Sequence, residues 1–354
     1  MPMGFLSIIE NKEIFSFMLN DEQWDRLKYK YKNLSMHMPC CQTRAIPKKS
    51  KLGTQYFAHH PSSTCSTPTG ESIEHQFCKY LILKYLYENG WTVTPEFRGQ
   101  TPSGEIWIAD IYAEKNKAKI AIEIQWSPQN IEETKRRQEK YKQSGIRAVW
   151  FMRTTQKNKW DVLDYQSYDL PVFSIWLNKE NYQLTASGAF HNYDNADLVE
   201  IEFIDFFKAL MSGDIQYSLK PNAARSLQFA MNTIQCWKCK KPTNTIMEIN
   251  YFIPHAKGFT KIYRLDVEDL SHTHNEILNH PSLIQSYQYG LIKKRFSKTR
   301  GEAYLSNGCY HCDALQGAFF SHHERDTHNM KYSHFIDVHI DHDTQIDGLW
   351  FYLK

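Results

Sequence analysis

The chain has 354 residues and a formal net charge of +3, with 42% hydrophobic and 23% charged residues. This length suits two or three domains, and the composition excludes wholesale disorder. The small net charge leaves a nucleic-acid partner open, because only a local concentration of charge would indicate one. We expect no membrane span, since no run of about 18 uninterrupted apolar residues occurs.

The start of the chain, MPMGFLSIIENKEIF, lacks the basic residues and the unbroken apolar stretch of a secretory signal. We therefore expect a cytoplasmic protein, whose 8 cysteines act as thiols or metal ligands before they form disulfides. Composition divides the chain into four parts. We expect an N-terminal segment (1–66), an α/β domain (67–178), a connecting segment with one helix at 204–211 (179–230) and a C-terminal module (231–354).

The N-terminal segment contains a cluster of cysteines and histidines that could form a small zinc site. Its members are Cys40, Cys41, His59, His60 and Cys65. Because adjacent cysteines rarely bind the same ion, we expect at most one of Cys40 and Cys41 to be a ligand. Cys41, His59 and Cys65 are the favoured candidates, and the alternative is that the cluster binds no metal.

The α/β domain shows helical and strand patterns in turn. Apolar and aromatic residues recur at helical spacing up to Asn89-Gly90, a pair that commonly ends a helix. Further on, apolar and polar residues alternate as in strands, and Ser127-Pro128 is a typical helix start. The expected elements are a helix over 71–88, strands over 91–97, 106–112 and 119–126, a helix over 127–144 and a strand over 146–152.

Two carboxylates, Asp110 and Glu123, interrupt consecutive apolar strands of this domain. Such a carboxylate costs several kcal/mol unless it is paired or bound to metal. Paired carboxylates bind Mg²⁺, which completes its shell with water and phosphate oxygens. Gln125 shares the face of Glu123 and could orient a water or touch a phosphate, but it cannot be a general base. The alternative is that both carboxylates face solvent in an antiparallel sheet.

The preceding helix offers polar residues near its start. Glu74 is a candidate third metal ligand. His75 and Lys79 are four residues apart and share a helix face, so they could hold a phosphate. Glu96, in the next strand, is a further candidate ligand. A solvated helix face explains His75 and Lys79 equally well, and a structural role explains Glu96 equally well.

The helix over 127–144 carries a basic run directly after the strand that holds Glu123. Such a run is usually a solvated face, but here it would neutralise a nucleic-acid backbone beside the expected metal. The candidate nucleic-acid contacts on this helix are Lys135, Arg136, Arg137, Lys140 and Tyr141.

Two CxxC motifs bracket the C-terminal module. Cys236 and Cys239 form the first, and Cys309 and Cys312 form the second. Four thiolates in two such turns are typical of a closed, structural Zn²⁺ site, here zinc-ribbon-like with a folded insertion at 243–308. The alternatives are four buried cysteines or two redox pairs.

The order of motifs in residues 36–153 resembles the competence protein CoiA-like family, within the PD-(D/E)xK nuclease superfamily. The resemblance rests on ESIEH at 71–75, Ala109-Asp110-Ile111, IAIEIQWS at 120–127 and the leader that ends at His59. It implies a restriction-endonuclease-like mixed sheet flanked by helices, with DNA as substrate. Gln125 stands where the parent motif has a lysine, which is a departure from that motif.

The leading hypothesis is a nuclease that uses Mg²⁺ or Mn²⁺ bound by Asp110, Glu123 and Glu74, with a role in processing foreign DNA or in defence against it. The first alternative is a nucleic-acid-binding protein whose nuclease core has lost its activity, with Gln125 as the sign of that loss. The second is an interaction scaffold whose zinc module docks a protein partner.

Overall fold

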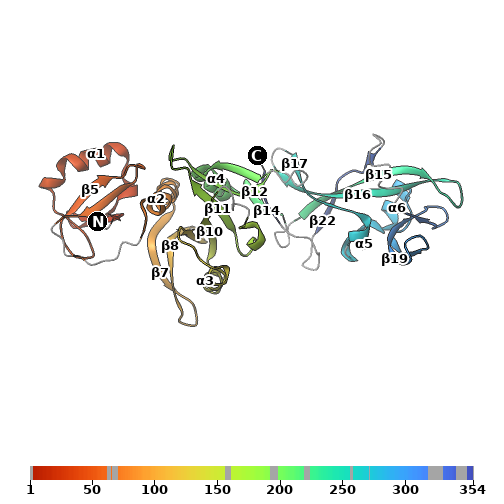
Figure 1. The fold of residues 1–354 in the computed structure, drawn as a ribbon, viewed down its shortest axis with the longest axis horizontal. Helices are drawn as coiled ribbons and strands as arrows, with labels where there is room; N and C mark the ends of the chain where they lie inside the picture. The colour runs from red at the N-terminus through yellow and green to blue at the C-terminus, as the bar shows by residue number, and fades with distance from the viewer. Residues whose placement is uncertain are drawn as a thin grey trace. The chain divides into compact units, whose positions relative to one another are not determined.

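The computed structural model describes residues 3–61, 65, 71–155, 161–191, 198–218, 224–255, 258–270, 272–317, 330–339 and 349–353. The chain forms two compact units. The first comprises residues 1–188 and 199–212, and the second comprises 189–198 and 213–354 (Figure 1). Among the described residues, no helix is both long and apolar enough to cross a membrane.

The N-terminal part of the first unit consists of two small antiparallel sheets and one helix. One sheet has the order β1 (Met3–Gly4), β6 (Gln55–His59), β5 (Ala45–Lys49), and the other β3 (Lys12–Phe15), β2 (Leu6–Ile9), β4 (Met36–His37). Helix α1 (Asp21–Lys30) begins with a capping box, in which Asn20 and Gln23 bond each other's backbone N–H. Trp24 of α1 packs against Phe57 of β6, and both are fully buried.

A mixed sheet forms the centre of the first unit, in the order β12-β11-β10-β9-β8-β7. The chain first makes an antiparallel meander of β7, β8 and β9. Strands β9, β10 and β11 are then parallel, and β12 is antiparallel to β11. β13 (Leu198–Glu202) pairs with β12. The bounds are β7 (Thr92–Gln100), β8 (Ile106–Lys115), β9 (Ala118–Gln125), β10 (Arg147–Arg153), β11 (Val172–Leu177) and β12 (Leu184–Phe190).

The two faces of this sheet carry different helices. Helices α2 (Ile73–Glu88) and α4 (Phe203–Ser212) cover one face, and α3 (Ile131–Gln143) covers the other (Figure 1). Neighbouring residues of β10 show the division, because strand side chains alternate. The Phe151 ring lies edge-on to Phe203 of α4, with centroids 5.1 Å apart. The Trp150 indole instead donates a 2.7 Å hydrogen bond to Gln138 of α3.

The structure confirms the predicted mixed α/β sheet with flanking helices, and one helix start differs. We predicted that the helix after β9 begins at Ser127-Pro128. It begins at Ile131 instead, with Asn130 as the N-cap, because the Asn130 side chain accepts a hydrogen bond from the Glu133 N–H at 2.8 Å. The predicted ends of the two helices at Asn89-Gly90 and Gly145 are confirmed, and both glycines have positive φ.

The second unit is built on long antiparallel strands. β15 (Ala224–Gln235) and β16 (Pro242–His255) form a hairpin, extended by β17 (Gly258–Leu265) on one side and by β21 (Lys331–Tyr332) and β22 (Ile336–His339) on the other. A second sheet has the order β18 (Lys293–Ser297), β19 (Glu302–Gly308), β20 (Leu315–Gln316). Helices α5 (His272–Leu278) and α6 (Pro281–Tyr287) precede it, and β14 (Ile215–Tyr217) pairs with β23 (Trp350–Tyr352).

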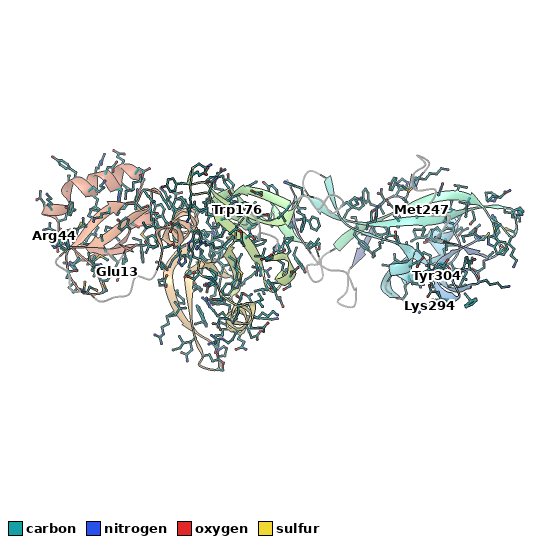
Figure 2. The ribbon with its side chains drawn as sticks, in the orientation of Figure 1. Glu13, Arg44, Trp176, Met247, Lys294 and Tyr304 are labelled. Atoms are coloured by element: carbon teal, nitrogen blue, oxygen red, sulfur yellow. The ribbon has the colours of Figure 1, made fainter. Side chains whose placement is uncertain are left out.

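The two sheets of the second unit are joined close to the cysteine pairs. The Asn307 side chain donates to the Ile246 carbonyl at 2.9 Å and accepts from the Ile246 N–H at 3.0 Å. Gly290 packs so closely on Gly308 that a Cβ at Gly290 would lie 2.4 Å from the Gly308 carbonyl carbon. Met247, on the same strand as Ile246, is buried (Figure 2). The segment at 243–308 therefore begins and ends close together, as predicted for the insertion.

Candidate active site

Strands β8 and β9 separate at the two predicted carboxylates. Their antiparallel pairing runs from Lys115 opposite Ala118 to Ile111 opposite Ile122 and ends there. One residue further along, Asp110 of β8 and Glu123 of β9 stand at the opening. The Asp110 carboxylate accepts a 2.8 Å hydrogen bond from the Ile124 N–H, so a side chain takes the place of a backbone partner.

Side chains of α3 fill this opening from one face of the sheet. The Tyr141 hydroxyl donates to the Ile108 carbonyl at 3.1 Å, and Arg137 donates to the same carbonyl at 3.3 Å. Lys140 donates to the Ile106 carbonyl at 3.2 Å. Carbonyl groups that β9 no longer pairs are thereby satisfied, which allows β8 to leave β9 while it remains paired with β7.

Glu123 is held by two of these α3 side chains. Its side chain is 2% exposed, an Arg137 guanidinium nitrogen lies 2.6 Å from the carboxylate, and the Tyr141 hydroxyl donates to the same oxygen. Arg137 also lies over the ring of Trp150, 4.9 Å from its centroid. Burial and the charge of Asp110 raise the pKa of Glu123 to about 8, although Arg137 and Tyr141 act in the opposite direction.

Asp110 faces α2. His75 Nε2 lies 3.5 Å from one Asp110 oxygen, and Lys79 Nζ lies 3.8 Å from the other. Burial alone would raise the pKa of Asp110, but the hydrogen bond with His75 and the charge of Lys79 outweigh it and hold the pKa below its usual value. Glu71 joins the group, with one oxygen 3.7 Å from His75 Nδ1 and 2.7 Å from Lys79 Nζ.

Lys79 is a buried cation among carboxylates. Its side chain is 1% exposed and forms ion pairs with Glu71, Glu96 and Asp110. Burial would lower the pKa of Lys79, but these negative charges together raise it, so the ammonium stays charged. Neither predicted role of Lys79 fits this burial, because the ammonium is neither on a solvated helix face nor open to a phosphate. Glu96, at a positive φ of 52°, is one of the ion-pair partners of Lys79.

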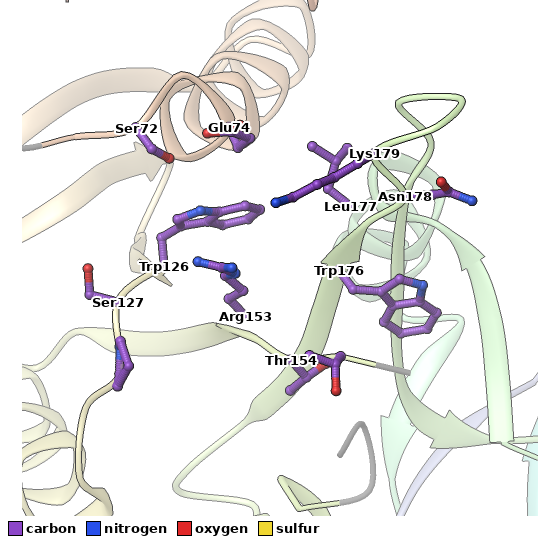
Figure 3. Close-up of a pocket in the computed structure, with 12 residues that line it drawn as sticks. Ser72, Glu74, Trp126, Ser127, Arg153, Thr154, Trp176, Leu177, Asn178 and Lys179 are labelled. Carbon is purple, nitrogen blue, oxygen red and sulfur yellow. The ribbon is translucent and has the colours of Figure 1, made fainter. Parts of the chain in front are cut away.

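The carboxylate that approaches Asp110 from the start of α2 is Glu71, which lies just before the Ser72 N-cap, and not the predicted Glu74. Ligand atoms of Glu71, His75 and Asp110 all lie within 4.8 Å of one another. The sequence contains a signal for this, because residues 71, 75 and 79 recur at intervals of four and so share one side of the chain entering the helix. Glu74 lies off that side and lines a separate pocket (Figure 3).

The remaining predicted site residues are distributed around this centre. Gln125 donates a 2.6 Å hydrogen bond to the Ser127 carbonyl, just beyond the end of β9. Arg137, Lys140 and Tyr141 face the opening, as described above. Lys135 and Arg136 point to solvent and form ion pairs with neighbouring acids of α3, Glu132 and Glu133. The predicted basic run therefore divides into an inner and an outer set.

The four C-terminal cysteines come together as the two CxxC motifs predicted. The sulfurs of Cys236 and Cys312 lie 3.7 Å apart, as do those of Cys239 and Cys309. All four sulfurs lie within 4.8 Å of one another, and each pair comes from a separate tight turn, after β15 and after β19. Such spacing suits a tetrahedral metal ion.

The N-terminal cluster also assembles, and it contains both adjacent cysteines. Cys40, Cys41, His59 and Cys65 offer ligand atoms within 4.8 Å of one another. Cys40 lies 3.1 Å from His59 Nε2 and 3.7 Å from Cys65. We expected at most one of Cys40 and Cys41 to be a ligand, but the structure places both in the cluster. The turn at residues 39–41 brings both sulfurs to the same side.

Comparison with protein families supports the resemblance seen in the sequence. Residues 71–185 match the family model described as competence protein CoiA, nuclease-like domain. This segment is similar to the nuclease-like domain of that family. It covers about a third of the chain and contains α2, the strands from β7 to β11 and α3. It also contains every residue of the acidic centre, which comprises Glu71, His75, Lys79, Glu96, Asp110 and Glu123. A comparison with curated proteins found no match.

Replacing Lys79 by methionine should lower the free energy of unfolding of the first unit by about 2 kcal/mol, because Glu71, Glu96 and Asp110 would face one another without a cation. We expect less than the roughly 3–5 kcal/mol of a fully buried pair, since the Glu96 side chain is 56% exposed. Urea unfolding followed by tryptophan fluorescence measures the change.

The matched control for this prediction is Lys142→Met. Lys142 lies on helix α3, and its removal breaks an exposed ion pair with Asp169. It should leave the transition unchanged. If the two variants unfold at the same urea concentration, Lys79 does not hold the acidic centre together.

Proposed function

We propose that this protein is a metal-dependent nuclease of the PD-(D/E)xK type that hydrolyses phosphodiester bonds, with DNA as the substrate. The observation that carries the proposal is the placement of Asp110 and Glu123 where β8 leaves β9, inside a CoiA nuclease-like domain. Two carboxylates at an opening between strands suit the chemistry of phosphate transfer, because a divalent ion there can be shared with phosphate oxygens. The restriction-endonuclease-like fold is part of the same proposal.

The residues of the acidic centre fit a divalent cation. Glu71, Glu96 and Asp110 contribute three carboxyl groups, and Lys79 supplies one positive charge among them. The surplus of negative charge favours a cation, and carboxylate oxygens are the ligands that Mg²⁺ and Mn²⁺ prefer. We assign Asp110, Glu71 and Glu123 as the candidate ligands, with His75 beside them. When bound, such an ion would activate a water and neutralise charge on the phosphate.

The residues around these ligands have positioning roles. The Ile124 N–H fixes the Asp110 carboxylate, and Arg137 with Tyr141 fixes Glu123. Gln125, whose amide donates to the Ser127 carbonyl, keeps its carbonyl oxygen as an acceptor for a water.

Lys135 and Arg136 are the candidate phosphate contacts, because their side chains are 55% and 58% exposed.

The two cysteine clusters complete the proposal as structural Zn²⁺ sites. Four sulfurs, or three sulfurs and one imidazole, are common ligand sets of closed tetrahedral zinc. In the C-terminal site, zinc would hold together two turns that lie about 70 residues apart in the chain. A site closed by four protein ligands has no open position for a substrate, so we assign neither cluster to catalysis.

Asp110→Asn and Glu123→Gln should each reduce metal-dependent cleavage by at least about a hundredfold, because each removes a carboxyl group that would hold the ion, worth several kcal/mol of transition-state stabilisation. The assay uses linear, circular and single-stranded DNA and RNA with Mg²⁺, Mn²⁺ or EDTA. Asp169→Asn, which changes an exposed carboxylate of the same domain, should cleave as the wild type does. A wild-type protein that binds DNA without cleaving it under any of these conditions would instead establish the inactive alternative.

The double variant Lys135→Gln/Arg136→Gln should weaken DNA binding and reduce the slope of log K against log salt concentration by about 1 for each phosphate that the protein no longer neutralises. Fluorescence anisotropy over a salt series measures this slope. Lys208→Gln is the matched control, because Lys208 is similarly exposed and pairs with an acid three residues away on α4. Equal slopes for both variants would show that the outer face of α3 is a solvated surface that makes no phosphate contacts.

Purified protein should contain two tightly held zinc ions per chain. Cys309→Ser should lose one and destabilise the second unit, since thiolate-bound zinc contributes on the order of 10 kcal/mol. Cys65→Ser should lose the other. Cys78→Ala, which removes a buried cysteine of α2 outside both clusters, should retain two. Elemental analysis tests these counts, and a zinc content unaffected by Cys309→Ser and Cys65→Ser would disprove both sites.

A further inference from the structure

A pocket of about 740 Å³ lies beside the acidic centre, on the other side of the first turn of α2 (Figure 3). Ser72 and Glu74 of this turn line the pocket, whereas Glu71 and His75 of the same segment face Asp110. One turn of helix thus separates the two. The opposite walls come from the segment just after β9 and from the ends of β10 and β11 with the residues that follow them.

The pocket combines an aromatic surface with cations. Trp126 directly follows Gln125 and is partly exposed, and the Arg153 guanidinium lies 5.4 Å from the centroid of its ring. In Figure 3 the Lys179 side chain extends toward the same ring. Arg153 and Lys179 are both exposed. Tryptophan with arginine is a typical platform for a base, and exposed cations attract its phosphate.

Glu74 is an acidic residue that lines the same pocket as these cations. A hydrogen bond with its own backbone N–H lowers the pKa of Glu74, with smaller contributions from Ser72, Lys51 and Lys179. Glu74 is therefore an ionised acceptor, which suits an N–H of a base edge and repels a phosphate. The pocket thus has a cationic side, an aromatic surface and an acceptor, and these match the phosphate, ring and polar edge of a nucleotide.

We propose that this pocket binds one unpaired nucleotide of the strand that enters the acidic centre, which makes single-stranded or locally opened nucleic acid the preferred substrate. The inference rests on the proposed nuclease function and specifies its substrate. A base can stack on Trp126 when its own face is free, whereas within a duplex the neighbouring bases of the stack cover both faces. Trp126 lies three residues beyond Glu123, roughly 10 Å along an extended strand, which is a reach of a few nucleotides.

The test measures binding separately from cleavage, in full-length protein carrying Asp110→Asn. Fluorescence anisotropy compares a 12-nucleotide single-stranded DNA, the same DNA with abasic sites, the blunt duplex and a mononucleotide. Single-stranded DNA should bind about tenfold more tightly than the duplex. Trp126→Ala should remove most of that preference, with about tenfold weaker binding of the single strand and unchanged binding of the duplex and the abasic strand. Trp126→Phe should retain most of the affinity, and Arg153→Gln should lower it.

Tyr29→Ala serves as the control, because Tyr29 is an aromatic side chain of α1 that is 88% exposed. It should bind all four ligands as the parent protein does. Equal losses for single strand, duplex and abasic strand in Trp126→Ala would overturn the proposal, as would a mononucleotide that binds as tightly as the strand. Binding that depends on Trp126 without any cleavage by the wild type would retain the pocket and reject the nuclease. Cleavage by the wild type that is unchanged in Trp126→Ala would retain the nuclease and reject the pocket.

Discussion

The early end of the pairing between β8 and β9 is the constraint on which the acidic centre depends. A sheet that stayed paired through residues 110 and 123 would leave no space for a carboxylate between the strands. Separation exposes backbone groups that must find other partners, and the protein supplies them from side chains. Asp110 takes the Ile124 N–H, and Tyr141 and Arg137 take the Ile108 carbonyl. The side chains that satisfy the backbone of the opening thus include a candidate metal ligand, Asp110, and two side chains that hold the other carboxyl group, Glu123.

Each carboxylate of the opening is neutralised from a different side of the sheet. Lys79 and His75 of α2 approach Asp110, whereas Arg137 and Tyr141 of α3 hold Glu123. The centre therefore exists only once both helices have packed on the meander, because neither helix alone satisfies both acids. This dependence links the hydrophobic packing of α2 and α3 directly to the electrostatics of the site.

Sequence patterns predicted the parts of this site that depend on local order. Alternation located β9 and the face of Glu123, and the intrusion of Asp110 into an apolar strand singled it out as a candidate site residue. Where β8 leaves β9 was not predictable, since strand periodicity does not report where pairing ends. Glu71 was missed although its spacing from His75 and Lys79 places it on their side of the helix. It lies just before the Ser72 cap, whereas the predicted Glu74 lies within the helix.

Other differences have equally physical causes. β12, with the sequence LTASGAF, is buried at every position and therefore shows no alternation, so the stretch after 180 gave no clear pattern. The CxxC pairs were predictable because each turn is local, and their convergence then follows from a compact insertion. A protein partner for the zinc module stays a prediction.

The long separation of the C-terminal cysteine pairs has a consequence for the order of events during synthesis. Cys239 and Cys309 are 70 residues apart, whereas Cys40 and Cys65 are 25 apart. At about 5–20 residues per second, the ribosome needs about 4–14 s to supply the second pair after the first has emerged. Throughout that interval Cys236 and Cys239 form an uncompleted dithiol, open to oxidation or to capture by another metal. The thiols of the N-terminal cluster are separated by fewer residues, so the first of them waits a shorter time for its last partner.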